Sequence, residues 1–161
     1  YPLECVEVMK NIIKTIEPTE KRGINEVIEL KEPKAKMLRS AAVLAQELGK
    51  SGIVVFTRSG RTARVLSYER PRAPVLAFTI DENVQRRLAL YWGIIPRRIA
   101  EMGSAEELIA TGERVLLEGG WARRDEPVLF LVGTSTTPGA TNSIKIERIG
   151  DLEREAERLR K

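Results

Sequence analysis

Hydroxyl and arginine side chains surround one glycine in the segment 57–62, whose sequence is TRSGRT. The segment follows an apolar run, Gly52–Phe56, that is typical of a strand buried on both faces, and it leads directly into a helical pattern. Gly60 has no Cβ, so the backbone there can approach a ligand closely. The first amides of a helix lack intrahelical partners and lie at the positive end of its dipole. We therefore predict a phosphate-binding turn formed by Thr57, Arg58, Ser59, Gly60, Arg61 and Thr62.

A simpler interpretation of this turn is a capped helix start whose arginines are solvated, and the spacing alone leaves both interpretations open. The turn does not match the Walker phosphate-binding loop, because no lysine precedes the hydroxyl residue and the glycine spacing differs. The chain also lacks a GxGxxG sequence. ATP hydrolysis at this turn is therefore not expected.

A second candidate segment is Gly133–Asn142, with the sequence GTSTTPGATN. It follows another predicted strand, so it should lie at the same edge of the sheet as the first turn. Its hydroxyls and glycines could close over a bound phosphoester. The alternative is a flexible hairpin connection.

The composition excludes several kinds of catalytic or metal site. The chain has no histidine, which excludes an imidazole base, a histidine-based triad and a histidine-ligated metal. Cys5 is the only cysteine, which excludes an intrachain disulfide and a cysteine-cluster zinc site. No apolar run approaches the roughly 20 residues that a membrane-spanning helix needs.

The charge of the chain is mildly basic and mixed in sign. Lys and Arg number 27 against 23 Asp and Glu, which gives a net charge of +4, and aromatic residues make up only 5%. Nucleic-acid-binding domains cluster their charge and supply aromatic stacking partners, so we expect neither a nucleic-acid nor a membrane partner. The isoelectric point near 9.4 nevertheless keeps a basic nucleic-acid-binding module as a third hypothesis. The many Glu, Arg and Lys residues fit a thermophilic source.

Hydrophobic spacing predicts helices and strands in alternation. The predicted helices are Tyr1–Glu17, Pro33–Leu48, Arg61–Tyr68, a helix capped by Thr79 or Asp81 that carries Val84, Leu88 and Leu90, and Ala105–Leu117, which Ser104 caps. The predicted strands are Gly52–Phe56, Pro74–Phe78, Gly93–Pro96, Pro127–Val132 and Ser143–Ile149. This alternation indicates an α/β sandwich with a mostly parallel sheet and one antiparallel hairpin.

The chain divides into three expected parts. Residues 1–22 form an apolar-faced helix with a polar connector, residues 23–150 form the main domain, and residues 151–161 form a C-terminal helical tail. The start at Tyr1, without Met or a signal-peptide pattern, indicates a fragment or a processed chain.

Several motifs occur in an order that resembles the carboxyl-terminal domain of pyruvate kinase. The resemblance covers roughly residues 35–149, and its specific parts are FTRSGRTA at 56–63, RP at 70–71 with AP at 73–74, LYWG at 90–93 and GATN at 139–142. The N-terminal YPLE and the apolar helix that it begins are similar to the last helix of the family's catalytic barrel.

The resemblance implies the three-layer α/β sandwich of that domain and a role in allosteric regulation and tetramer assembly of a cytoplasmic glycolytic enzyme. Phosphoryl transfer from phosphoenolpyruvate to ADP takes place in the family's barrel, with Mg²⁺ and K⁺. None of the barrel's catalytic residues maps onto this chain, so we expect the chain alone to be inactive and to hold no cofactor. The resemblance assigns the effector phosphate to residues 57–62 and a closing loop to Thr137, Pro138, Gly139, Ala140, Thr141 and Asn142.

One departure from the family concerns the effector. Members that respond to fructose bisphosphate hold its second phosphate with an Arg and a Trp before the final hairpin, but residues 99–117 offer only Arg114 and no Trp. The resemblance thus favours a monophosphate, such as a nucleotide or a sugar phosphate. The alternative function is a stand-alone phosphometabolite sensor, against which the apolar helix at 1–17 argues, because its face needs a barrel to cover it.

Overall fold

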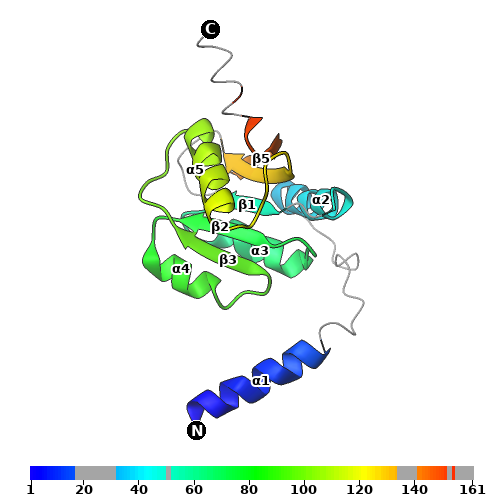
Figure 1. Ribbon diagram of the computed structural model, residues 1–161, viewed down its shortest axis with the longest axis vertical. Helices are drawn as coiled ribbons and strands as arrows, with labels where there is room; N and C mark the ends of the chain where they lie inside the picture. Colours follow the sequence, from blue (N-terminus) through cyan, green and yellow to red (C-terminus); the bar gives the residue numbers. More distant parts are fainter. Residues whose placement is uncertain (17–31, 50–51, 134–140, 152–153, 155–161) are drawn as a thin grey trace.

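Helices cover both faces of a five-stranded sheet in the computed structural model, which describes residues 1–16, 32–49, 52–133, 141–151 and 154 (Figure 1). The helices are α1 (Pro2–Ile16), α2 (Pro33–Glu47), α3 (Arg61–Glu69), α4 (Glu82–Leu88) and α5 (Ala105–Glu118). The strands are β1 (Ile53–Phe56), β2 (Val75–Thr79), β3 (Ile94–Arg98), β4 (Pro127–Gly133) and β5 (Thr141–Arg148). The alternation expected from the sequence is confirmed.

The strands lie in the order β3-β2-β1-β4-β5. Strands β3, β2, β1 and β4 are parallel, and β5 pairs antiparallel with β4. This confirms the mostly parallel sheet with one antiparallel hairpin. The chain moves outward from β1 through β2 to β3 and then returns to add β4 on the other side of β1, so the winding direction reverses between β1 and β4.

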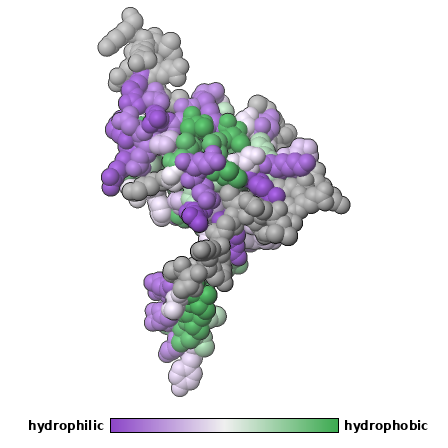
Figure 2. Space-filling view, turned by 90° about the vertical axis from the view of Figure 1, so that its right-hand side faces the viewer, coloured by the Kyte–Doolittle hydropathy of each residue, from purple (hydrophilic) through white to green (hydrophobic). Residues whose placement is uncertain are grey.

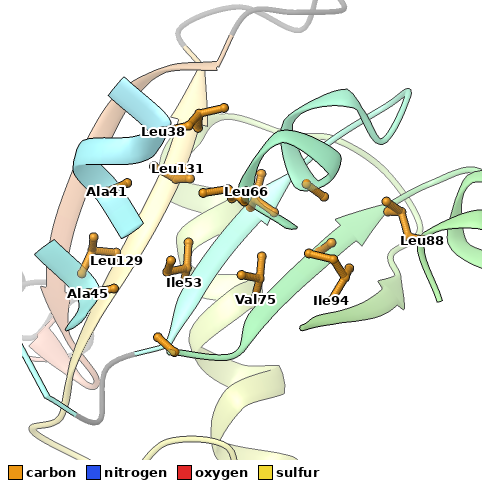
Figure 3. Close-up of a cluster of buried hydrophobic side chains, with 14 of the residues drawn as sticks. Leu38, Ala41, Ala45, Ile53, Leu66, Val75, Leu88, Ile94, Leu129 and Leu131 are labelled. Atoms are coloured by element: carbon orange, nitrogen blue, oxygen red, sulfur yellow. The ribbon is translucent and has the colours of Figure 1, made fainter. Parts of the chain in front are cut away.

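The central strand β1 is apolar at every position because both of its faces are buried. Ile53 and Val55 belong to a core cluster that includes side chains of α2, α3 and α4 (Figure 3). Val54 and Phe56 belong to a second cluster, on the other face, with side chains of α5. A strand buried on both faces has no solvent-facing position, and all four β1 residues are buried.

Two predicted helix starts are confirmed by their caps. The Asp81 carboxylate accepts hydrogen bonds from the amides of Asn83 and Val84, so Asp81 rather than Thr79 caps α4. At α5, Ser104 and Glu107 form the reciprocal capping box. The prediction for Leu90 is wrong, because α4 ends at Leu88 and the Leu90 side chain is exposed.

Helix α1 is confirmed as a helix, but it buries none of its residues. Its large apolar side chains are exposed, and Figure 2 shows them gathered along one face. The predicted connector lies outside the described residues, and so does the C-terminal tail except for Asp151 and Arg154.

Candidate functional site

The candidate turn lies at the carboxyl end of β1, beside the carboxyl end of β4. Strands β1 and β4 are parallel neighbours, with Val55 opposite Leu131. The winding direction of the sheet reverses between them, and open α/β sheets bind ligands in the crevice outside such a reversal. The residues after Phe56 therefore stand at the edge where this fold class places its ligands.

Backbone geometry closes the turn tightly around Gly60. The Gly60 amide donates a hydrogen bond to Thr57 Oγ1 at 2.9 Å, which fixes the buried Thr57 hydroxyl beneath the turn. Gly60 has a φ of +80°, in the left-handed region that favours glycine. A Cβ on Gly60 would lie 3.2 Å from Leu88 Cδ2 and 3.3 Å from Val84 Cγ1, so the turn packs directly on α4.

Helix α3 begins without a side-chain cap, since Gly60 occupies its N-cap position. The Arg61 amide reaches Ser59 Oγ at 3.5 Å, a long contact. The Arg64 amide donates to Gly60 O, the first backbone bond of the helix. Within the part of the chain that the structure describes, the amides of Thr62 and Ala63 have no acceptor. These donors lie at the positive end of the α3 dipole, the arrangement that binds anions.

Positive charge gathers around these amides. Arg58 is half-buried and forms no ion pair with any described residue. Arg61 is exposed and lies 3.5 Å from the Glu32 carboxylate, measured from Nη2 to Oε2. Burial lowers the pKa of Lys34 below its ordinary value, and the nearby charge of Arg61 lowers it further, whereas Glu32 raises it. The positive charges of Arg61 and Lys34 thus repel each other.

The second candidate segment meets the first at one point. Thr62 Oγ1 lies 3.4 Å from Thr141 Oγ1, and either hydroxyl can donate the hydrogen bond. Thr141 and Asn142 belong to β5 rather than to a loop, because Thr141 pairs with Gly133 across a register shift. Thr137, Pro138, Gly139 and Ala140 lie outside the described residues.

Glu32 and Lys34 were missed by the sequence reasoning. They stand at the start of α2, which packs beside α3, and this brings them to Arg61. Their only signal in the sequence is that Pro33 opens a helix there, and nothing in that pattern indicates which other helix start lies beside it.

The described residues contain no group of three His, Cys, Asp or Glu side chains that could hold a metal ion. None of the described helices combines the length and the apolar character that crossing a membrane requires.

Comparisons with known proteins find relatives that match most of the chain. A family model described as "Pyruvate kinase, alpha/beta domain" matches residues 35–147. The chain is 33% identical to a pyruvate kinase of Clostridium acetobutylicum over 91% of its length, 32% identical to one of Agrobacterium vitis over 92%, and 30% identical to one of Geobacillus stearothermophilus over 94%. These alignments take up 32%, 32% and 27% of the three relatives. The chain therefore spans about a third of the length of the curated relatives it matches.

Proposed function

The chain belongs to the pyruvate kinase family, and we propose that it is the regulatory and assembly domain of such an enzyme, with a phosphate effector bound at residues 57–62. The observation that carries the proposal is the position of this turn. It places uncapped helix amides, Arg58 and Arg61 at the point where the sheet reverses its winding.

In this proposal, the reaction of the parent enzyme takes place outside this domain. Phosphoryl transfer from phosphoenolpyruvate to ADP, with its Mg²⁺ and K⁺, is assigned to a catalytic barrel. The described residues offer no group of three His, Cys, Asp or Glu side chains for a metal ion, and this proposal assigns none to them. Residues 1–22 would contribute the last helix of that barrel, and residues 23–150 would form the regulatory domain. The uncovered apolar face of α1 supports this division, because a barrel would bury it.

Regulation would follow from the thermodynamic linkage between effector binding and the equilibrium of active and inactive tetramers. An effector that binds the active tetramer better than the inactive one shifts the population toward activity by its difference in affinity. The contact between Thr62 and Thr141 supports a site that spans α3 and β5, so that a bound phosphate would hold these elements together.

A monophosphate fits the site better than a bisphosphate. Arg114 is the only arginine in residues 99–117, and its Nη1 lies 3.5 Å from Glu118 Oε1 at the exposed end of α5. A second phosphate would have to draw Arg114 away from this carboxylate. We expect the second phosphate to add no affinity, so that a sugar bisphosphate binds no more tightly than the corresponding monophosphate, which parallel calorimetric titrations would measure.

The direct test is Ser59→Asp, which places a carboxylate at the exposed start of the turn. Titration with inorganic phosphate at fixed ionic strength should show binding by the unmodified chain and none by the variant. Ser40→Asp adds the same charge on the exposed face of α2 and should leave the affinity unchanged. Equal affinities of the Ser59→Asp variant and the unmodified chain would remove the turn as the phosphate site.

A mass measurement separates the domain from a stand-alone sensor. The denatured protein from its native source should be several-fold heavier than the 18.1 kDa of this chain if a barrel is attached. A native mass near 18.1 kDa would favour the sensor instead.

A further inference from the structure

A hollow of about 190 Å³ lies between α3 and α4, on the side of the turn that packs against α4. The residues that matter for its chemistry are Gly60, Arg64, Val84, Arg87, Leu88 and Tyr91. Its size suits a small organic molecule, since an engineered apolar cavity of about 150 Å³ holds benzene.

The floor of the hollow is apolar and firmly held. Val84 and Leu88 are 4% and 1% exposed, and both belong to the core cluster under α3 and α4. Gly60 packs directly on these two side chains, and Tyr91 adds an aromatic ring to the lining. Ligand sites combine such apolar walls with a few convergent polar groups.

The rim of the hollow is positively charged. Arg64 extends from α3 and Arg87 from α4, and neither forms an ion pair with any residue in the described part of the chain. Arg61 also lines the hollow, but it lies near Glu32. No acidic side chain is among the lining residues. Guanidinium groups bind carboxylates and phosphates through paired hydrogen bonds, so two of them on facing helices favour an anion.

We propose that this hollow binds a small organic anion, a carboxylate or a phosphate ester, whose charged group contacts Arg64 and Arg87 while its apolar body lies on Val84 and Leu88. The site goes beyond the proposed effector phosphate, because its donors are side chains of α3 and α4. The hollow adjoins the proposed effector site and shares Ser59, Gly60 and Arg61 with it, but Arg64 and Arg87 lie outside residues 57–62.

Four probes distinguish the contribution of the negative charge to binding from that of the apolar contact. They are benzoate, phenyl phosphate, benzyl alcohol and inorganic phosphate. We expect benzoate or phenyl phosphate, or both, to shift the methyl NMR signals of Val84 and Leu88 in the full chain. Whichever of the two binds more tightly identifies the anionic group. Benzyl alcohol lacks the charge, so it should not produce these shifts. Inorganic phosphate lacks the apolar body, so any shift that it causes through the turn at Gly60 should not depend on Arg64 or Arg87.

Variants then test the two arginines. Arg87→Gln and Arg64→Gln should each weaken the organic anion about tenfold, the order expected for one hydrogen bond to a charged group. Arg86→Gln is the matched control, because Arg86 is the neighbour of Arg87 on α4 but pairs with Glu82 and does not line the hollow. The proposal is overturned if no organic anion shifts these methyls, if benzyl alcohol shifts them equally, or if Arg86→Gln weakens binding as much as Arg87→Gln.

Thr62→Val separates the two sites. It should weaken inorganic phosphate at the turn and leave the organic anion in the hollow unaffected. Binding of inorganic phosphate that depends on Thr62, together with no binding of either organic anion, would support the site at the turn and contradict the site in the hollow. The opposite pattern would remove the turn and retain the hollow.

Discussion

The hydroxyl oxygens of Thr62 and Thr141 lie 3.4 Å apart although 79 positions separate the two residues in the chain. Thr62 stands in the first turn of α3, and Thr141 begins β5. The contact bridges the two segments that flank the reversal of the sheet, so a phosphate at the proposed effector site could accept a hydrogen bond from either hydroxyl.

The Thr62 hydroxyl should therefore contribute directly to phosphate affinity. Thr62→Val keeps the shape of the side chain and removes the donor, so phosphate should bind about tenfold more weakly, as expected for a lost hydrogen bond to a charged group. Ser40→Ala removes an exposed hydroxyl on α2 that donates to the Lys36 carbonyl oxygen, and it should leave the affinity unchanged. Calorimetric titration measures both variants, and an unchanged affinity of Thr62→Val would take this hydroxyl out of the site.

Glu32 should act as a competitor for the anion. Its carboxylate lies 3.5 Å from Arg61, so a phosphate must displace it or tolerate its charge. Glu32→Gln should raise phosphate affinity by a few-fold, an effect limited by the exposure of both groups. Glu118→Gln removes the same charge from an exposed pair with Arg114 and should leave the affinity as it was. A lower phosphate affinity in Glu32→Gln would contradict the assignment of Arg61 to the site.

Lys34 reports on the charge of Arg61. Its pKa is lowered in the folded chain, first by burial and then by Arg61, so the unfolded chain binds more protons just below pH 10.5. The free energy of unfolding should accordingly rise with pH between the folded pKa of Lys34 and 10.5. Arg61→Gln should raise the pKa of Lys34 toward its ordinary value, and Arg64→Gln should not. Carbon NMR titration of the Lys34 side chain measures the shift directly, and an unmoved pKa in Arg61→Gln would contradict the influence of Arg61 on Lys34.

The sequence predicted the elements well because their signals are local. The apolar run of β1, the Ser104 capping box and the TRSGRT turn each depend on residues close together in the chain. Strand order is not local, so the reversal between β1 and β4 and the contact of Thr62 with Thr141 could only be expected in outline. The pairing of Glu32 with Arg61 depends on how α2 packs beside α3, which no short pattern specifies.

Gly60, the one glycine of the turn, should tolerate substitution poorly. Gly60→Ala forces an alanine to a φ of +80° and brings its Cβ within 3.3 Å of two buried side chains on α4. Gly49→Ala is the control for conformation alone, because Gly49 has a φ of +84° with nothing within 4 Å of the added Cβ. A left-handed backbone costs an alanine roughly 1–2 kcal/mol. Gly60→Ala should lower the free energy of unfolding by more than Gly49→Ala does, because it must also displace Val84 and Leu88. Urea unfolding measures both variants. Equal losses of unfolding free energy would mean that α4 moves away from the added Cβ at no cost.

The ion pair of Arg39 and Glu69 tests whether a partly buried charge pair stabilises this fold. Arg39 Nε donates to Glu69 Oε2 at 2.8 Å, and the Glu69 side chain is only 4% exposed. Arg39→Met would leave the Glu69 carboxylate buried without its partner, which should lower the free energy of unfolding by about 3 kcal/mol. Arg86→Met removes an arginine from an exposed pair with Glu82 and should cost at most about 0.5 kcal/mol.

The double variant Arg39→Met with Glu69→Leu should recover most of that loss. Arg39 Nη2 is buried and has no hydrogen-bond partner among the described residues, so the pair leaves a polar atom unsatisfied even when intact. Apolar side chains of similar size remove both the stranded carboxylate and this unsatisfied nitrogen, and such replacements are often neutral or stabilising. Urea unfolding of the two single variants and the double variant completes the cycle. If the losses of unfolding free energy in the two single variants add up to the loss in the double variant, the two side chains contribute through packing, independently of their charges.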